Sequence, residues 1–126
     1  MTLREDPTDQ ATIIAAGITL HEALAAYETL KHEGISVRVI DLYSIKPLDR
    51  ETLEKAARET KVIITVEDHF PEGGIGEAVA AALSHTTTPV HSLAVRLMPH
   101  SGTPDELLAA AQINSSAIIQ KIRALL

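Results

Sequence analysis

The chain has 126 residues, which fits a single domain, and its apolar share of 45% is enough to build a core from Ala, Leu, Ile and Val. A net charge of −6 and an aromatic share of 2% exclude a typical nucleic-acid-binding surface, because such a surface needs cationic side chains and stacking rings. Cysteine is absent, which excludes disulfides and thiolate chemistry, and no apolar run approaches the roughly 20 residues that span a bilayer. Residues 1–10 are polar and charged, so we expect no secretory signal.

Strand-like and helix-like patterns alternate along the whole chain. Short apolar runs predict buried strands, while apolar residues every three or four positions predict helices. Thr19 and Glu22 have the spacing of a capping box, which makes Thr19 the predicted cap of the first helix, and Gly34 lies where a helix usually ends. The predicted elements are, in chain order, a strand at 12–16, a helix from Thr19 to Gly34, a strand at 36–41, a helix capped by Asp49, a strand at 62–67, a helix after the glycines at 73–76, a strand at 90–96, a helix from Thr103 to about Ala111, and a helix capped by Asn114 or Ser115.

This alternation predicts a mostly parallel sheet with helices on both faces and right-handed crossovers. The residues predicted to face inward in the first three helices are Leu20, Ala23, Leu24, Tyr27 and Leu30, then Leu53, Ala56, Ala57 and Thr60, and then Ile75, Ala78, Val79, Ala82 and Leu83. The last helix has an apolar stripe formed by Ile118, Ile119, Ile122, Leu125 and Leu126. This stripe is wider than one sheet contact needs, so it is either partly exposed for a partner or wholly buried by the sheet.

A glycine-rich turn, with Gly73, Gly74 and Gly76, leads into the third predicted helix. Free backbone N–H groups at a helix start can bind a phosphate. Here four carboxylates and no lysine or arginine lie within a few residues, and the spacing matches neither a Walker A loop nor a dinucleotide-binding turn. We therefore interpret the glycines as residues that let the helix pack closely on the sheet, with an anion site as the alternative.

Ligands of open parallel sheets gather at the carboxyl ends of strands, where this sequence places Gly17, residues 42–44, the triplet Glu67-Asp68-His69, and residues 99–101. Consecutive residues point to different sides, so the triplet converges only if the chain turns sharply. Without a second histidine at helical spacing, a metal or acid–base site is the weaker reading. We interpret the triplet as a solvated or partner-facing acidic turn.

Histidines and one arginine are the remaining candidates for chemistry. His21 and His32 lie off the apolar stripe of the first helix, so we expect them in solvent or at an interface, and His91 opens a strand in a structural role. The pair His100-Ser101 suggests a nucleophile, but it lacks the G-x-S-x-G elbow and a carboxylate to orient the base. Arg96 ends its strand and is interpreted as partner-facing or solvated.

Several blocks of the sequence follow one another in a recognisable order. They are residues 17–23 (GITLHEA), 39–49 (VIDLYSIKPLD), 65–69 (TVEDH), 72–79 (EGGIGEAV) and 101–108 (SGTPDELL). Together they resemble the third, C-terminal domain of transketolases from about Ala11 to the end of the chain. Deoxyxylulose-phosphate synthases and the β subunits of 2-oxo-acid dehydrogenase E1 share this domain, but the Glu-Asp-His triplet and the Ser-Gly-Thr-Pro block favour transketolase.

The resemblance implies a three-layer α/β/α domain. Its mostly parallel five-stranded sheet would have one antiparallel edge strand, supplied here by residues 2–5. We accordingly expect one domain over residues 1–126, in which residues 1–10 are the short edge strand and lead-in.

The resemblance also implies the C-terminal domain, or a separately encoded piece, of a thiamine-diphosphate-dependent transketolase. The parent enzyme would transfer a two-carbon ketol unit between sugar phosphates in the pentose phosphate pathway. Thiamine diphosphate and Mg²⁺ or Ca²⁺ would be bound on two preceding domains, and the Gly-Asp-Gly diphosphate motif of those enzymes is absent from this sequence. No catalytic, cofactor-binding or metal-binding residue is therefore carried over to this chain, which we expect to be inactive alone.

Its expected role is structural and dimer-supporting, in the cytoplasm, with the remaining domains or subunit of a homodimeric transketolase as partners and with no nucleic acid and no membrane. Two alternatives stay open. The chain is an independent small-molecule-binding regulatory module that uses the strand ends at Asp68–His69 and Pro99–Ser101, or it is the equivalent domain of a deoxyxylulose-phosphate synthase or a 2-oxo-acid dehydrogenase E1 β subunit.

Overall fold

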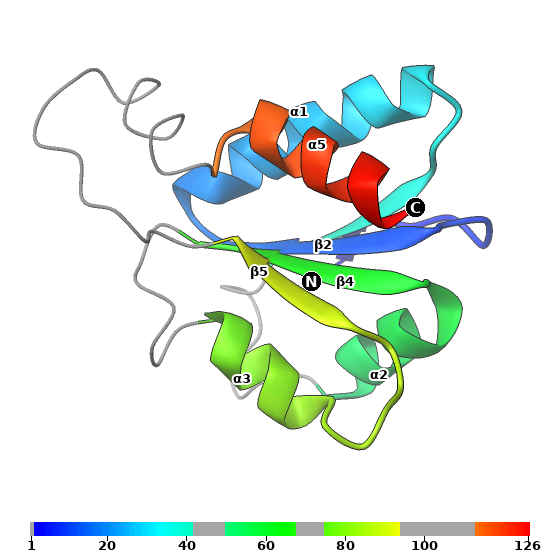
Figure 1. Cartoon of the computed structure of the whole chain (residues 1–126), viewed down its shortest axis with the longest axis vertical. Helices are drawn as coiled ribbons and strands as arrows, with labels where there is room; N and C mark the ends of the chain where they lie inside the picture. Colours follow the sequence, from blue (N-terminus) through cyan, green and yellow to red (C-terminus); the bar gives the residue numbers. More distant parts are fainter. Residues whose placement is uncertain (1, 42–49, 68–74, 94–112) are drawn as a thin grey trace, which may run out of the picture.

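The computed structural model describes residues 2–41, 50–67, 75–93 and 113–126. In these residues a central sheet lies between two helical layers, with α1 and α5 on one face and α2 and α3 on the other (Figure 1). The elements are β1 (Thr2–Arg4), β2 (Ala11–Ala15), α1 (Ile18–His32), β3 (Val37–Asp41), α2 (Arg50–Glu59), β4 (Val62–Val66), α3 (Ile75–Ala82), β5 (Val90–Leu93) and α5 (Ser115–Leu125).

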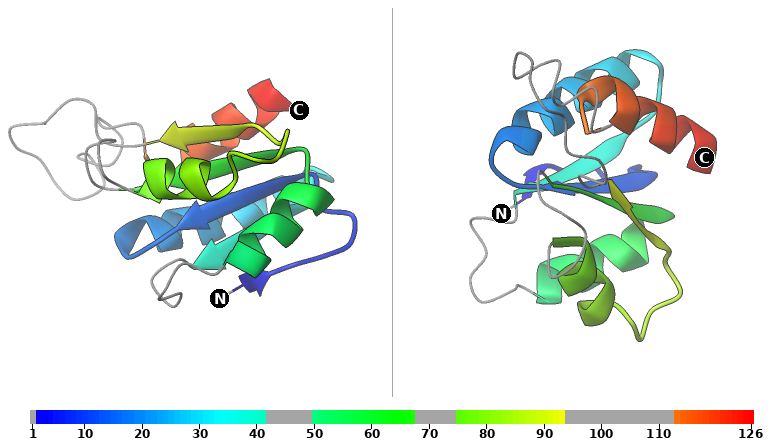
Figure 2. Two further views of the ribbon diagram at one scale, coloured as in Figure 1. Left: turned by 90° about the horizontal axis from the view of Figure 1, so that it is seen from below. Right: turned by 60° about the vertical axis from the view of Figure 1, so that its left-hand side comes forward.

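The sheet has five strands in the order β1-β3-β2-β4-β5. Strands β3, β2, β4 and β5 are parallel, and β1 pairs antiparallel with β3 at the edge. This arrangement confirms the three-layer fold with one antiparallel edge strand. Figure 2 shows the two helical layers on opposite sides of the twisted sheet.

The core consists of two apolar clusters, one on each face of the sheet, because successive side chains of a strand point to opposite faces. In the central strand, Ile13 faces α1 and α5 while Ile14 faces α2 and α3. Strands β2 and β4 are buried along their whole length, as expected for parallel strands covered by helices on both sides. Leu53, Ala56 and Ala57 of α2 lie in the second cluster, as predicted.

The inner face of α3 is narrower than predicted. Val79, Ala82 and Leu83 are buried, but Ala78 is exposed, so its placement in the core was wrong. Gly76 brings the first turn of the helix against the sheet, and the buried side then follows positions 76, 79, 82 and 83. Ala78 shares the exposed side of α3 with Glu77 and Ala81, because residues three or four positions apart lie on the same side of a helix.

The predicted capping box at the start of α1 was also wrong. Gly17, with a φ of 63°, is the N-cap residue, and Thr19 lies within the first turn. The buried Thr19 hydroxyl donates toward the backbone oxygens of Ala16 (2.8 Å) and of Val66 in β4 (2.9 Å). Glu22 turns away from this cap and accepts the N–H of Ser115 at the start of α5, at 3.0 Å.

Two other helix ends follow the sequence signals. Gly34 comes directly after the C-cap residue of α1 with a φ of 81°, the left-handed conformation that glycine adopts readily. Asn114 caps α5, because its Oδ1 accepts the N–H of Ala117 at 3.0 Å. The predicted cap at Asp49, the predicted helix from Thr103 and the end of the predicted strand 90–96 lie outside the described residues.

The apolar stripe of α5 is mostly buried against α1 and the sheet. Ile118 and Ile122 are fully buried, and Ile119 is 9% exposed. Leu125 packs at the margin of the cluster, and Leu126 is 43% exposed. The buried alternative therefore holds for the three isoleucines. None of the described helices is long and apolar enough to cross a membrane.

Candidate functional site

The carboxyl edge of the parallel strands is the first place to search for a site. Among the described residues this edge contains Gly17 after β2, Glu67 directly after β4, and the start of α3. Thr19 connects the ends of β2 and β4, because its hydroxyl hydrogen-bonds to the backbone oxygens of Ala16 and Val66. The edge is thus tied together by side-chain hydrogen bonds to the backbone.

Glu67 is buried, with 1% of its surface exposed, so its interpretation as part of a solvated acidic turn was wrong. Its Oε2 accepts the N–H of Gly76 in the first turn of α3, at 2.8 Å. The first N–H groups of a helix lack intrahelical acceptors and carry partial positive charge, so a carboxylate is stabilised there. Asp68 and His69 lie outside the described residues.

Gly76 allows α3 to approach the sheet closely. A Cβ at this position would lie 2.7 Å from Ser92 Oγ and 3.1 Å from Thr65 Oγ1. Thr65 and Ser92 are register partners in β4 and β5, so both hydroxyls face the glycine from the same side of the sheet. The prediction that a glycine serves close helix–sheet packing is confirmed at Gly76, while Gly73 and Gly74 lie outside the described residues.

The chemistry that this edge can perform follows from these contacts. Glu67 already accepts the N–H of Gly76, so this donor is not available to a phosphate. Within the described ranges, no group of three His, Cys, Asp or Glu side chains is arranged to hold a metal ion. His100, Ser101 and Arg96 lie outside the described residues.

The remaining histidines take no part in a common site. His21 and His32 are exposed on α1, as predicted, and His91 is half-buried in β5. His85 Nε2 lies 3.4 Å from Glu54 Oε1, and both side chains are substantially exposed. These four histidines are spread over α1, the turn after α3 and β5, and none belongs to a described group of three residues that could hold a metal ion.

A network of charged residues at the opposite, amino edge was missed by the sequence analysis. Arg38 of β3 is 1% exposed and lies among Asp9, Glu59 and Glu5, a set that we call the Arg38 network. Its Nε donates to Asp9 Oδ2 at 3.2 Å and its Nη2 to Glu59 Oε1 at 2.9 Å, while Nη1 lies 3.7 Å from Glu5 Oε1. The available signal was an arginine inside an otherwise apolar, buried strand, because buried charges are almost always paired.

The electrostatics of the Arg38 network favour the charged guanidinium. Burial alone would lower the pKa of Arg38, but the hydrogen bonds to Glu59 and Asp9 outweigh burial and raise that pKa above its ordinary value. Asp9 is itself buried and accepts a further hydrogen bond from Ser36 Oγ at 2.7 Å. The charged groups of the network are thus paired with one another.

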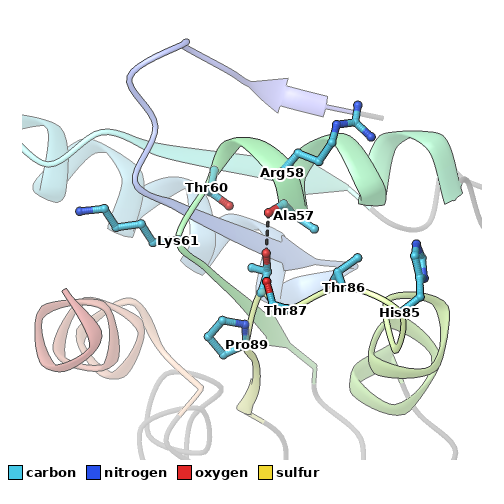
Figure 3. A pocket seen from close by; sticks show the side chains of 9 residues that line it. Ala57, Arg58, Thr60, Lys61, His85, Thr86, Thr87 and Pro89 are labelled. Atoms are coloured by element: carbon cyan, nitrogen blue, oxygen red, sulfur yellow. Dashed lines mark hydrogen bonds between the residues drawn. The ribbon is translucent and has the colours of Figure 1, made fainter.

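A shallow cavity of about 620 Å³ lies between the end of α2 and the loop before β5 (Figure 3). Arg58 and Lys61 line it from α2 and the residues after it, and the threonine-rich loop lines the other side. In Figure 3 the Arg58 and Lys61 side chains point away from each other. The Thr88 hydroxyl donates a hydrogen bond to the carbonyl oxygen of Ala57. Because the cations do not converge, the cavity lacks the geometry of an anion site.

Comparison with known proteins identifies the family. Residues 2–118 match the family model described as "Transketolase, C-terminal domain". Mouse transketolase is 54% identical over 119 residues, which cover 93% of this chain and 19% of that protein. "Transketolase-like protein 1" from Bos taurus is 52% identical over 126 residues, which cover 98% of this chain and 21% of that protein. The chain thus spans about a fifth of the length of these curated relatives.

Solved structures give the same fold. A chain described as "Split gene transketolase, inactive beta4 tetramer" matches with a TM-score of 0.85 and 34% identity, covering 97% of this chain and 43% of that one. A 2-oxoglutarate:ferredoxin oxidoreductase from Magnetococcus marinus, at 15% identity and a TM-score of 0.66, shares the fold alone. With the family model covering most of its length, the chain belongs to the transketolase C-terminal domain family.

Proposed function

We propose that this chain is the C-terminal domain, or a separately encoded piece, of a thiamine-diphosphate-dependent transketolase, and that its role is structural. The observation that carries the proposal is the family match over residues 2–118, combined with relatives named transketolase that are about five times longer. The parent enzyme would transfer a two-carbon ketol unit between sugar phosphates in the pentose phosphate pathway of the cytoplasm. The whole chain would act as one domain within it.

Thiamine diphosphate and its metal ion belong, on this proposal, to other parts of the parent enzyme. A diphosphate needs cationic or N–H donors, and the described helix start at the carboxyl edge is already occupied by the Glu67 carboxylate. A divalent metal needs a group of oxygen ligands, and the described residues offer no such cluster of carboxylates and histidines. The donor chemistry of the described residues therefore does not fit the cofactor.

The supporting role consists of association with the remaining domains or subunit and of stabilising a homodimer of the parent. The contacts of Glu67 at the carboxyl edge and of Arg38 at the amino edge agree with this role, because they hold neighbouring segments of the chain against the sheet. Arg38 and Glu67 are each buried and hydrogen-bonded within the domain.

Fragment complementation tests the proposal. We expect this chain to show no ketol transfer alone, and to bind and activate a mouse transketolase from which the C-terminal region has been removed. Intact mouse transketolase is the positive control, and an Ile122→Asp variant, which places a carboxylate in the core, is the matched negative control. Sedimentation measures association, and a coupled assay measures ketol transfer.

Three results would contradict the proposal. The first is ketol transfer by this chain alone. The second is a saturable calorimetric signal with thiamine diphosphate and Mg²⁺ tighter than about 1 mM, near −4 kcal/mol. The third is the absence of any association with the truncated transketolase under conditions in which that enzyme's own C-terminal region associates with it.

A further inference from the structure

The segment that leads into the domain, residues 2–10, is fastened to the sheet along its length. Strand β1 pairs with β3, and Gln10 N–H donates to Ser36 O at 2.8 Å. Between these backbone contacts the chain makes a tight turn. In this turn Asp9 Oδ2 accepts the N–H of Asp6 at 2.8 Å, and Asp6 Oδ1 accepts the N–H of Thr8 at 2.8 Å.

The Arg38 network joins this turn to the rest of the domain. Two of its carboxylates, Glu5 and Asp9, come from the leading segment, and the third, Glu59, comes from the last turn of α2. Lys55 of α2 adds a contact of 3.2 Å to Glu5. One buried guanidinium therefore joins two other pieces of chain, the leading segment and α2, to its own strand β3.

The direction of β1 determines at which edge of the sheet the leading segment begins. Thr2 pairs with Ile40, near the carboxyl end of β3, and Arg4 pairs with Val39. The segment therefore starts beside the carboxyl edge of the sheet and runs back to the amino edge, where the Arg38 network holds it. Any chain that continues before β1 reaches the domain from the side of the carboxyl edge.

We propose that the Arg38 network is a clasp that fixes the leading segment, and thereby fixes the direction from which the preceding part of the protein meets this domain. The second half of this inference rests on the proposed function, because it assumes a preceding domain. The clasp suits the task because its guanidinium is almost fully enclosed, and added salt screens buried pairs much less than exposed ones. Planar guanidinium groups also hold several carboxylates in a defined geometry.

Hydrogen exchange of the isolated chain tests the clasp without any partner. In an Arg38→Met variant, we expect the amides of Asp6, Thr8, Asp9 and Gln10 to exchange at least tenfold faster, while the amides of Ile63 and Glu67 in the central sheet keep their rates. The matched control is Arg123→Met, which breaks the ion pair between α5 and Glu33 at another place on the surface. The control should leave the exchange of residues 2–10 unchanged.

Equal acceleration of exchange in the leading segment and in the central sheet would overturn the proposal. It would mean that Arg38 stabilises the whole core and does not specifically hold the leading segment. Unchanged exchange in residues 2–10 would overturn it as well. Should Arg38→Met fail to fold, the double variant Glu5→Gln/Glu59→Gln changes only the two partly exposed carboxylates and is judged by the same criterion.

The direction of approach is tested with spin labels, which is simple here because the chain has no native cysteine. Labels at Thr2→Cys and at the exposed Glu28→Cys of α1 should give a narrow distance distribution that broadens with Arg38→Met and stays narrow with Arg123→Met. A broad distribution in the otherwise unchanged chain would refute the clasp. These experiments need no second domain, so a failed complementation with an intact clasp would count against the proposed function alone.

Discussion

Replacing Gly76 with alanine tests the close approach of α3 to the sheet. The added Cβ would lie 2.7 Å from Ser92 Oγ, 3.0 Å from Ser92 Cβ and 3.1 Å from Thr65 Oγ1. The first separation is shorter than side chains tolerate, so either Ser92 rotates or the helix shifts away from the sheet. Overpacking of this kind costs about 1–3 kcal/mol, and the better helix propensity of alanine returns up to about 1 kcal/mol. We expect Gly76→Ala to lower the free energy of unfolding by about 1–2 kcal/mol.

A double-mutant cycle with Ser92→Ala identifies the cause of this loss. The second change removes Oγ, the nearest atom, but leaves Cβ at 3.0 Å, so we expect a partial rescue with a coupling energy of about 0.5–1 kcal/mol. Gly34→Ala is the matched control. No heavy atom lies within 4 Å of its added Cβ, and its cost of about 1 kcal/mol arises from the positive φ of 81°.

Urea denaturation of the single and double variants gives these free energies. Ser92→Ala should not change the cost of Gly34→Ala, because a Cβ added at Gly34 contacts neither Ser92 nor any other residue. The reasoning fails if Gly76→Ala costs the same in the original chain as in the Ser92→Ala background, or if it stabilises the protein. Either result would mean that the glycine serves no packing purpose.

Four further predictions follow from single contacts. Thr65→Val should raise the free energy of unfolding by about 1 kcal/mol, since the buried Thr65 hydroxyl has no hydrogen-bond partner in the described structure, and a lower urea midpoint would contradict this. Glu22→Ala should lower thermal stability by removing the acceptor for the first N–H of α5, and unchanged exchange of that amide would refute the contact. The pKa of Asp6 should lie below its ordinary value of 3.8, because it accepts hydrogen bonds from the hydroxyl and the N–H of Thr8, so its contribution to stability is lost only as pH falls through that lowered pKa. Carboxyl NMR should show Thr8→Ala moving the midpoint upward, and no movement would count against this cause. Ile119→Lys should cost about 2–4 kcal/mol in chemical denaturation because it buries a charge, and a fully stable monomer would show that position 119 faces outward.

The sequence predicted the layered architecture well because the signals for it are local and repeated. The apolar runs of the central strands need helices on both faces, and strands covered in this way are usually parallel. Gly34 and Asn114 lie at helix ends for reasons contained in their own backbone and side chains, so both predictions were confirmed. The antiparallel edge strand came from the resemblance and was confirmed by the pairing of β1 with β3.

The failures occur where a side chain has a partner far away in the sequence. Thr19 and Glu22 have the spacing of a local cap, yet Thr19 bonds to Val66, and Glu22 bonds to the N–H of Ser115. Gly17 takes the cap position because its positive φ turns the chain before Thr19. A capping motif shows only that suitable hydrogen-bonding partners are close in the sequence. It does not show whether the fold brings a competing partner from elsewhere in the chain.

Arg38 and Glu67, two of the buried charged residues that the sequence analysis missed or misread, have one property in common. Glu67 holds the first turn of α3 at the carboxyl edge, and Arg38 holds the leading segment at the amino edge. Each side chain connects a strand of the sheet to a neighbouring segment, and each forms its hydrogen bonds within the domain. A catalytic group needs instead a side chain that faces substrate and exchanges a proton or a bond with it. Buried charge that secures connections is what a domain requires if its task is to keep its shape while other domains perform the chemistry, which is the role proposed for this chain.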